Sequence, residues 1–262
     1  MDPVSDRGLR ILVTNDDGFH APGLQVLERI AAEISDDVWT VAPDSEQSGA
    51  SHSLTLSDPL RLRQHEPRRY AVRGTPTDCV LMAVKNILDR PPDLVLSGVN
   101  RGQNLAEDVT YSGTIAAAME GTALGIPSVA LSQAYGFDGS RQLKWQTAER
   151  HAPALISKLF AREWTPGILF NVNFPDVEAD DVAGVQITSQ GKRDQALLVV
   201  DERTDARGVP YFWFGFERKR SNPPEGSDLR AVYQGNISIT PLHLDLTHQS
   251  SLDALRRDFA PD

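Results

Sequence analysis

The chain has 262 residues, enough to bury a sizeable core in one large α/β domain or two modest ones. Its 26 lysine and arginine residues are outnumbered by 36 aspartate and glutamate residues, so the formal charge is −10. A field of that sign disfavours binding to nucleic acid and to anionic membranes, and a small anion would need a local cation to attract it. Hydrophobic residues make up 40% and charged residues 24%, a balance typical of a folded globular protein.

Cysteine content and hydropathy bear on where the protein works. Cys79 is the single cysteine in the sequence, which excludes an intrachain disulfide and a cysteine-rich zinc site and favours a reducing compartment. The first ten residues are polar and lead into an apolar run too short for the core of a secretion signal. No uncharged apolar stretch approaches the roughly 18 residues that a membrane-spanning helix needs. The sequence therefore predicts a soluble, cytoplasmic protein.

The first half of the chain alternates short apolar runs with helical patterns, as the strands and crossover helices of a parallel sheet do. Apolar runs predict strands over 11–14, 38–42, 94–96 and 128–131. Helical spacing of apolar residues predicts helices over 23–34, 77–88 and 114–124. The runs 60–62 and 70–72 indicate a hairpin-like excursion, and Thr75 or Thr77 is a candidate cap of the helix that follows.

The second half begins with a predicted helix over 145–160 and a strand over 168–172, which is expected to close the main sheet. The pattern then changes to strand-like runs separated by glycines, over 185–187, 197–200, 211–216 and 237–239, before a short helix over 252–259. We predict an α/β fold: a core over 1–175 with a mainly parallel sheet, and a β-rich extension over 176–262 within one integrated domain. An extended arm of this kind is common material for subunit exchange, so a dimer fits the sequence.

Two adjacent carboxylates, Asp16 and Asp17, follow the first predicted strand and lie at its carboxyl end, where open α/β sheets bind ligands. Such carboxylates repel unless a cation lies between them or water screens them, and a divalent metal ion is the simplest buried solution. An ordinary exposed turn is the competing interpretation, because Asp17-Gly18 is a common turn dipeptide.

Two later loops open at the same predicted edge of the sheet. The serine-rich loop 43–53 offers hydroxyl groups to a metal or a phosphate, and Ser48-Gly49 is its tightest point. After the strand at 94–96, the amide oxygen of Asn100 suits a hard cation, and Ser112, Gly113 and Thr114 begin a helix whose free N–H groups suit a phosphate. A solvated loop and simple helix capping explain the same residues one at a time. The convergence of three loops favours a shared site.

Several competing signatures are missing from the sequence: the dinucleotide-binding G-x-G-x-x-G, the phosphate loop, the hydrolase G-x-S-x-G and the zinc motif H-E-x-x-H. The six histidines show no zinc spacing, although His20 and His52 lie in candidate loops. The basic run 217–220, with Lys192 and Arg193, could face an anionic substrate, but a solvated charged hairpin is the simpler interpretation.

These motifs resemble those of the SurE survival-protein family of metal-dependent nucleotidases and acid phosphatases. Among the residues that carry the resemblance are Asn15-Asp16-Asp17-Gly18, Gly74-Thr75-Pro76-Thr77-Asp78 and Tyr111-Ser112-Gly113-Thr114. Further matching blocks, in the same order and at the same spacing, lie at 41–44, 48–51, 92–100, 116–121, 239–242 and 245–247. The tail departs from the family pattern at Ser227 and Asn236, which bears on base preference and assembly and leaves the metal residues untouched.

The resemblance implies a ligand set. Residues matching Asp16, Asp17, Ser48 and Asn100 hold one divalent metal ion per subunit, Mg²⁺ or Mn²⁺. The family's phosphate contacts fall on Asn104 and on the turn formed by Ser112, Gly113 and Thr114. The resemblance also implies a Rossmann-like sheet with helices on both faces, and a β-rich C-terminal extension that exchanges between subunits in a homodimer or homotetramer.

The predicted activity is hydrolysis of nucleoside monophosphates, as 5′ or 3′ esters, to nucleoside and phosphate by in-line attack of water. Asp16 and Asp17 are the candidate catalytic residues, and Asp16 is our choice for orienting or deprotonating the water. Two alternatives remain open: a phosphatase acting mainly on polyphosphate or other phosphomonoesters, and a non-catalytic, metal-dependent nucleotide-binding protein. No nucleic-acid or membrane partner is expected.

Overall fold

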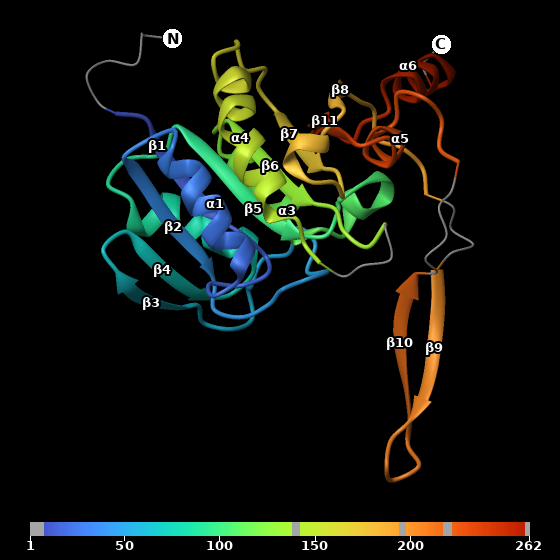
Figure 1. Cartoon of the computed structure of the whole chain (residues 1–262), viewed down its shortest axis with the longest axis horizontal. Helices are drawn as coiled ribbons and strands as arrows, with labels where there is room; N and C mark the ends of the chain where they lie inside the picture. The colour runs from blue at the N-terminus through green and yellow to red at the C-terminus, as the bar shows by residue number, and fades with distance from the viewer. Residues whose placement is uncertain (1–7, 138–141, 194–197, 217–221, 260–262) are drawn as a thin grey trace.

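The structure is a computed structural model that describes residues 8–137, 142–193, 198–216 and 222–259. Within these ranges its largest element is a nine-stranded sheet, drawn as arrows with helices packed around it in Figure 1. The strands of this sheet are β1 (Arg10–Thr14), β2 (Asp37–Pro43), β3 (Arg61–Glu66), β4 (Arg69–Arg73), β5 (Leu94–Arg101), β6 (Ser128–Gln133), β7 (Ile168–Phe174), β8 (Gly184–Ile187) and β11 (Asn236–His243).

The order across the sheet is β3-β4-β2-β1-β5-β6-β7-β11-β8. The six strands from β4 to β7 in this order run parallel to one another. The edges differ, because β3 is antiparallel to β4 and β11 is antiparallel to β7, while β8 is parallel to β11. The predicted α/β class with a mainly parallel sheet is confirmed.

Helices cover both faces of the sheet, as predicted. Alternate residues of β1 point to opposite faces: Ile11 and Val13 pack with α1 and α4, whereas Leu12 packs with α2. Across the described ranges, none of the helices is long and apolar enough to span a membrane. The helices are α1 (Pro22–Ala32), α2 (Pro76–Met82), α3 (Gly113–Ala123), α4 (Trp145–Phe160), α5 (Asp228–Tyr233) and α6 (Gln249–Asp258), with a π-helical turn η1 (Ala83–Ile87) and the 3-10 turns η2 (Ala106–Thr110) and η3 (Ala179–Asp181).

Two expectations about the sheet are wrong. The strand at 168–172 does not close it, because β11 and β8 continue the sheet beyond β7 and Ile237 and Ile239 of β11 join the main core. The runs 60–62 and 70–72 do form the predicted hairpin, as the antiparallel strands β3 and β4, but this hairpin is not an excursion, because β4 pairs in parallel with β2 and so belongs to the main sheet. Strand partners far apart in the chain leave no local signal, so periodicity identified the strands without ordering them.

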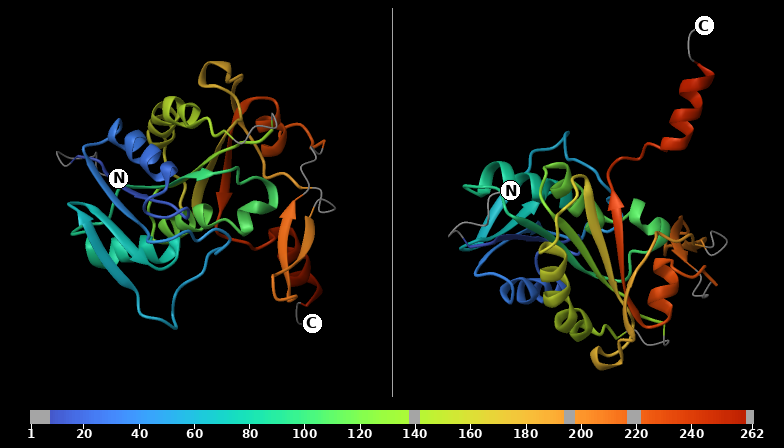
Figure 2. Two further views of the ribbon diagram at one scale, coloured as in Figure 1. Left: turned by 60° about the horizontal axis from the view of Figure 1, so that its bottom comes forward. Right: turned by 90° about the horizontal axis from the view of Figure 1, so that it is seen from above.

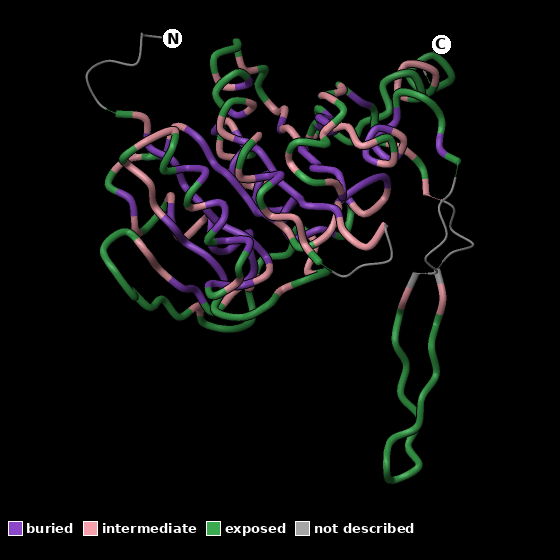
Figure 3. Tube along the Cα trace, in the orientation of Figure 1, coloured by how far each residue is buried: buried purple, intermediate pink, exposed green. Residues whose placement is uncertain are grey.

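Strands β9 (Leu198–Thr204) and β10 (Pro210–Phe216) form a separate antiparallel hairpin that projects from the body (Figure 1). Figure 3 shows it exposed along most of its length, and α6 also stands away from the sheet in the right view of Figure 2. Residue 197, the first of the predicted strand 197–200, lies outside the described residues, as does the basic run 217–220.

Candidate metal and phosphate site

The turn after β1 is buried at the carboxyl edge of the sheet. Asn15 is 1% and Asp16 only 4% exposed, so the alternative of an ordinary exposed turn does not hold for Asp16. The Nδ2 group of Asn15 donates to the carbonyl of Gly18 at 2.9 Å and tightens the turn. Gly18 has a φ of +101°, a conformation that other residues rarely adopt. The Oδ1 atom of Asn15 is buried, and within the described part of the chain it has no hydrogen-bond partner.

The N-terminus of α3 meets this turn directly. The hydroxyl of Thr114 donates to Oδ1 of Asp16 at 2.5 Å. A Cβ atom on Gly113 would lie 2.7 Å from the Cβ atom of Asp16, so only glycine permits this approach. Ser112 caps the helix, accepting from the N–H of Ile115 at 3.1 Å. The capping interpretation therefore holds for Ser112, whereas Thr114 instead orients a carboxylate of the candidate site.

Asp17 and Asn100 are linked through the end of β5. The N–H of Arg101, the residue after Asn100, donates to Oδ2 of Asp17 at 3.0 Å. The Nδ2 group of Asn100 donates to the carbonyl of Gly102 at 2.8 Å, so its Oδ1 atom is the one that remains available to a ligand. The pairing of β5 with β6 shifts register between Ser97 and Asn100, because three steps along β5 match two along β6, and this bulge sets the position of Asn100 near the end of the strand.

The serine-rich loop reaches the same turn. The N–H of Gln47 donates to the backbone carbonyl of Asp16 at 2.8 Å. Ser48, the next residue, therefore lies close to the turn after β1. The hydroxyl of Ser48 donates to Glu46 at 3.0 Å. Farther along, Ser51 donates its hydroxyl to the carbonyl of Thr110 at 2.8 Å and so ties the loop to the segment before α3. All three predicted loops therefore converge on Asp16 and Asp17.

Burial dominates the electrostatics of the two carboxylates. It raises the pKa of Asp16 to about 6, opposed by the hydrogen bond from Thr114 and reinforced by the charge of Asp17. The pKa of Asp17 is also raised, mainly by burial, against the hydrogen bond from the Arg101 N–H; the charge of Glu46 raises it further. Among the described residues neither carboxylate forms an ion pair with a lysine or arginine side chain. A divalent cation would supply a counter-charge to these carboxylates, and the oxygen-bearing side chains around them fit such an ion.

Asn104 is held by a buried amide network. Its backbone N–H donates to Oδ1 of Asn173 at 2.8 Å, and its carbonyl accepts from the Asn171 side chain at 2.8 Å. Its own Nδ2 group donates to the hydroxyl of Ser132 at 2.8 Å. Sequence reasoning missed these supporting residues and also Glu46. The signal for the network was present, because polar asparagines at 171 and 173 in an apolar strand need buried partners.

The remaining candidates lie apart from this cluster. His52 pairs with Glu120 at 2.9 Å, and the ring of His20 packs edge-on against Phe19. Arg193 forms an ion pair with Asp108. In the part of the chain that the structure describes, no three His, Cys, Asp or Glu side chains are grouped to hold a metal.

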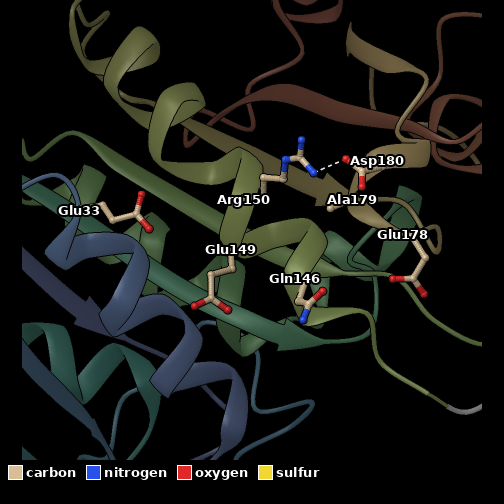
Figure 4. A pocket seen from close by; sticks show the side chains of 7 residues that line it. All are labelled: Glu33, Gln146, Glu149, Arg150, Glu178, Ala179 and Asp180. Atoms are coloured by element: carbon tan, nitrogen blue, oxygen red, sulfur yellow. Dashed lines mark hydrogen bonds and ion pairs between the residues drawn. The ribbon is translucent and has the colours of Figure 1, made fainter.

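A pocket of about 350 Å³ lies between α1, α4 and η3, away from these loops (Figure 4). Its acidic side chains disfavour a phosphate, and three of its charged side chains are already paired: Glu149 with Arg29, and Arg150 with Asp180. The pocket contains none of the predicted site residues. Its lining residues are Glu33, Gln146, Glu149, Arg150, Glu178, Ala179 and Asp180.

Comparison with known proteins identifies the family. The family model described as survival protein SurE matches residues 11–196. A relative from Parvibaculum lavamentivorans named 5′-nucleotidase SurE is 65% identical over 250 residues, covering 95% of this chain and 90% of its own. One of the same name from Methylobacterium radiotolerans is 61% identical, covering 96% and 100%. The crystal structure of SurE protein from Aquifex aeolicus is 38% identical, with a TM-score of 0.82 over 95% of this chain and 98% of that one. The chain belongs to the SurE survival-protein family.

Proposed function

We propose that this protein is a 5′-nucleotidase, a phosphomonoesterase that hydrolyses nucleoside monophosphates to nucleoside and phosphate. The family match and the names of relatives that are 58–65% identical over nearly the whole chain support this function. The observation that carries it is the buried carboxylate of Asp16 at 2.5 Å from Thr114, on the first turn of α3. The carboxylate of Asp16 and the N-terminus of α3, which can bind an anion, therefore lie side by side.

A single divalent ion, Mg²⁺ or Mn²⁺, would be held by Asp16, Asp17, Ser48 and Asn100. The chemistry of this donor set supports the assignment, because carboxylate, hydroxyl and amide oxygens are ligands of hard cations. The burial of Asp16 without a cationic side-chain partner among the described residues supports it as well. When bound, the ion would polarise a phosphoryl oxygen and lower the pKa of water.

The side chains around that ion have separable roles. Asp16 is the candidate for orienting the attacking water or accepting a proton from it, because its carboxylate is buried and held in place at the carboxyl end of β1. Thr114 holds this carboxylate in one orientation through its hydroxyl. The N–H groups at the start of α3 and the side-chain amide of Asn104, whose Nδ2 group carries a second hydrogen, would bind the phosphoryl oxygens and stabilise the charge that grows on them. Gly113 contributes by its small size, which brings the helix terminus to the carboxylate.

Phosphate release from nucleoside monophosphates tests the function. We expect the metal-loaded protein to release phosphate, a chelator to stop the release, and Mg²⁺ or Mn²⁺ to restore it. Asp16→Asn should abolish release without changing the circular dichroism spectrum, while Asp36→Asn, at an exposed carboxylate, should leave it unchanged. Full activity of Asp16→Asn would remove this residue from the mechanism. Binding without turnover would favour a nucleotide-binding protein, and preferred hydrolysis of polyphosphate over nucleotides would favour the other phosphatase.

We further propose that the β9–β10 hairpin mediates assembly into a homodimer or homotetramer. Phe212 and Phe214 share one face of β10 and are 58% and 80% exposed, and Trp213 on the other face is 59% exposed. Apolar side chains on both faces of a lone hairpin favour a protein partner, and a second copy of the chain is the simplest one. Size-exclusion chromatography with light scattering tests this: Trp213→Ser with Phe214→Ser should give monomers. A monomeric parent protein would contradict the proposal.

A cytoplasmic location is also proposed. It rests on Cys79, whose free thiol is buried in the core. Burial raises the pKa of this thiol well above its ordinary value, so the thiol stays protonated and unreactive. Fractionation of the producing cells, followed by detection of the protein, tests the location directly.

A further inference from the structure

A groove of about 430 Å³ opens beside the candidate site. It shares Gln47 with the serine-rich loop, and the N–H of that residue donates to the carbonyl of Asp16. Its opposite wall ends at Thr75, directly before Pro76, whose Cγ atom would lie 3.2 Å from a Cβ atom on Gly113. The groove is therefore adjacent to the point where Asp16 meets α3. Its lining residues are Gln47, Thr55, Asp58, Pro59, Arg61, Arg73, Gly74 and Thr75.

Two arginines of this groove lie directly opposite each other. Arg61 on β3 and Arg73 on β4 are register partners in an antiparallel pair, so their side chains leave the same face of the sheet. The guanidinium group of neither arginine forms a hydrogen bond or an ion pair with any described residue. By contrast, the nearby Arg68 and Arg69 both have acidic partners, Asp37 for the first and Glu28 and Glu66 for the second.

This arrangement has an electrostatic cost. Like charges directly opposite on neighbouring strands destabilise the pair, and Asp58 is the one acidic residue among the lining side chains. The groove thus keeps a net positive charge in a chain whose formal charge is −10. An anion placed between the two guanidinium groups would relieve the repulsion, and guanidinium groups match the geometry of phosphate oxygens.

The walls of the groove are fixed by their own hydrogen bonds. Asp78 accepts from the hydroxyl of Thr55 at 2.6 Å and from the N–H of Thr75 at 2.8 Å, and Thr75 donates its hydroxyl to the carbonyl of Ser53. A Cβ atom on Gly74 would lie 2.8 Å from Asp78, so the chain packs tightly there. The loop that carries Thr55 is therefore held to the start of α2, and the groove keeps its shape without a ligand.

We propose that this groove binds a phosphate group, and that its source is a nucleoside with phosphates at both its 5′ and 3′ positions. The proposal rests on the proposed function: the reacting phosphate would lie at Asp16 and the start of α3, and the second one between Arg61 and Arg73. The enzyme would then prefer nucleoside bisphosphates over monophosphates. The groove adds binding energy for the second phosphate and takes no part in the reaction itself.

Steady-state kinetics on the metal-loaded enzyme test the preference. The ratio of kcat/KM for a nucleoside 3′,5′-bisphosphate to that for the 5′-monophosphate should fall roughly fivefold or more in Arg61→Ala with Arg73→Ala, because exposed charge pairs each contribute about a factor of two to five. Activity on the monophosphate should stay within about twofold of the parent. Arg63→Ala, on the same strand but outside the groove, is the matched control and should leave the ratio unchanged. Arg61→Lys with Arg73→Lys should restore most of the preference, because it keeps both charges.

A binding measurement separates this proposal from the proposed function. Methylenebisphosphonate, which is not hydrolysed, should bind the parent protein and bind the double alanine variant at least about fivefold more weakly in a calorimetric titration. If the double alanine variant is active and its ratio of kcat/KM values is unchanged, the proposed role of the groove is wrong, and the proposed nucleotidase function is unaffected. If neither the parent nor any variant releases phosphate, the proposed nucleotidase function is wrong. Equal binding of methylenebisphosphonate by the parent and the double alanine variant would then show that the groove does not bind phosphate either.

Free phosphate distinguishes the source of the bound group. Inhibition of monophosphate hydrolysis by inorganic phosphate should be equal in the parent and the double alanine variant if the groove serves the second phosphate of the substrate. Inhibition that depends on the two arginines, with an unchanged substrate ratio, would assign the groove to a free ion and overturn the bisphosphate preference. The double alanine variant should melt at or above the temperature of the parent, since it loses a like-charge pair.

Discussion

Replacing Asp16 by asparagine should stabilise the metal-free protein while abolishing activity. Burial raises the pKa of Asp16 from an ordinary value of 3.8 to about 6. Above pH 6 this buried carboxylate is ionised, and its charge destabilises the folded state. At 1.36 kcal/mol per pH unit, the difference between the two pKa values corresponds to roughly 3 kcal/mol. Asparagine has a similar shape, can still accept the hydrogen bond from Thr114, and carries no charge.

The sign of the pH dependence follows from the raised pKa. The proton on Asp16 stabilises the folded state fully below pH 3.8, and this contribution is lost as the pH rises through about 6. The difference in unfolding free energy between Asp16→Asn and the parent should therefore be near zero below pH 3.8 and increase with pH above that value. It should grow to roughly 3 kcal/mol by pH 7.5, equivalent to about 6–12 °C in melting temperature for a chain of this size.

Thermal and urea unfolding between pH 4.5 and 7.5, with a chelator present, measure this difference. Asp36→Asn, at an exposed position, serves as the control for removal of one negative charge. Adding Mg²⁺ or Mn²⁺ should raise the melting temperature of the parent and have little effect on Asp16→Asn. A variant that is less stable than the parent at pH 7.5, or a difference that does not change with pH, would refute the reasoning from burial.

Two substitutions probe how the site is supported. Gly113→Ala would bring a Cβ atom to 2.7 Å from the Asp16 side chain, so it should cost about 1–3 kcal/mol of stability and reduce phosphate release, whereas Gly8→Ala, at a position with open space, should do neither. Asn173→Ala leaves the backbone N–H of Asn104 without its partner and should cost about 1–3 kcal/mol in urea unfolding. Its kcat/KM should fall about tenfold or more, and an unchanged value would show that Asn104 is positioned by other contacts.

The site could be located from the sequence to the level of its loops. Strand patterns placed Asp16, Asn100 and the serine-rich loop at one edge of a parallel sheet, because parallel strands end on the same side. The choice of Ser48 over Ser45 came from the family resemblance and not from the pattern. Glu46, which contacts Ser48 and raises the pKa of Asp17, went unnoticed because an exposed glutamate in a polar loop has no distinguishing signal.

The sequence by itself determined the α/β class, the positions of most helices and strands, and the two carboxylates at the end of β1, since these follow from local periodicity and motif. Only the tertiary structure decided that β11 and β8 extend the sheet past β7, that the hydroxyl of Thr114 contacts Asp16, and that Arg61 lies opposite Arg73. These features join residues up to 98 positions apart. They depend on strand order, register and packing, which are set by the free energy of the whole fold and leave no trace in any short stretch of chain.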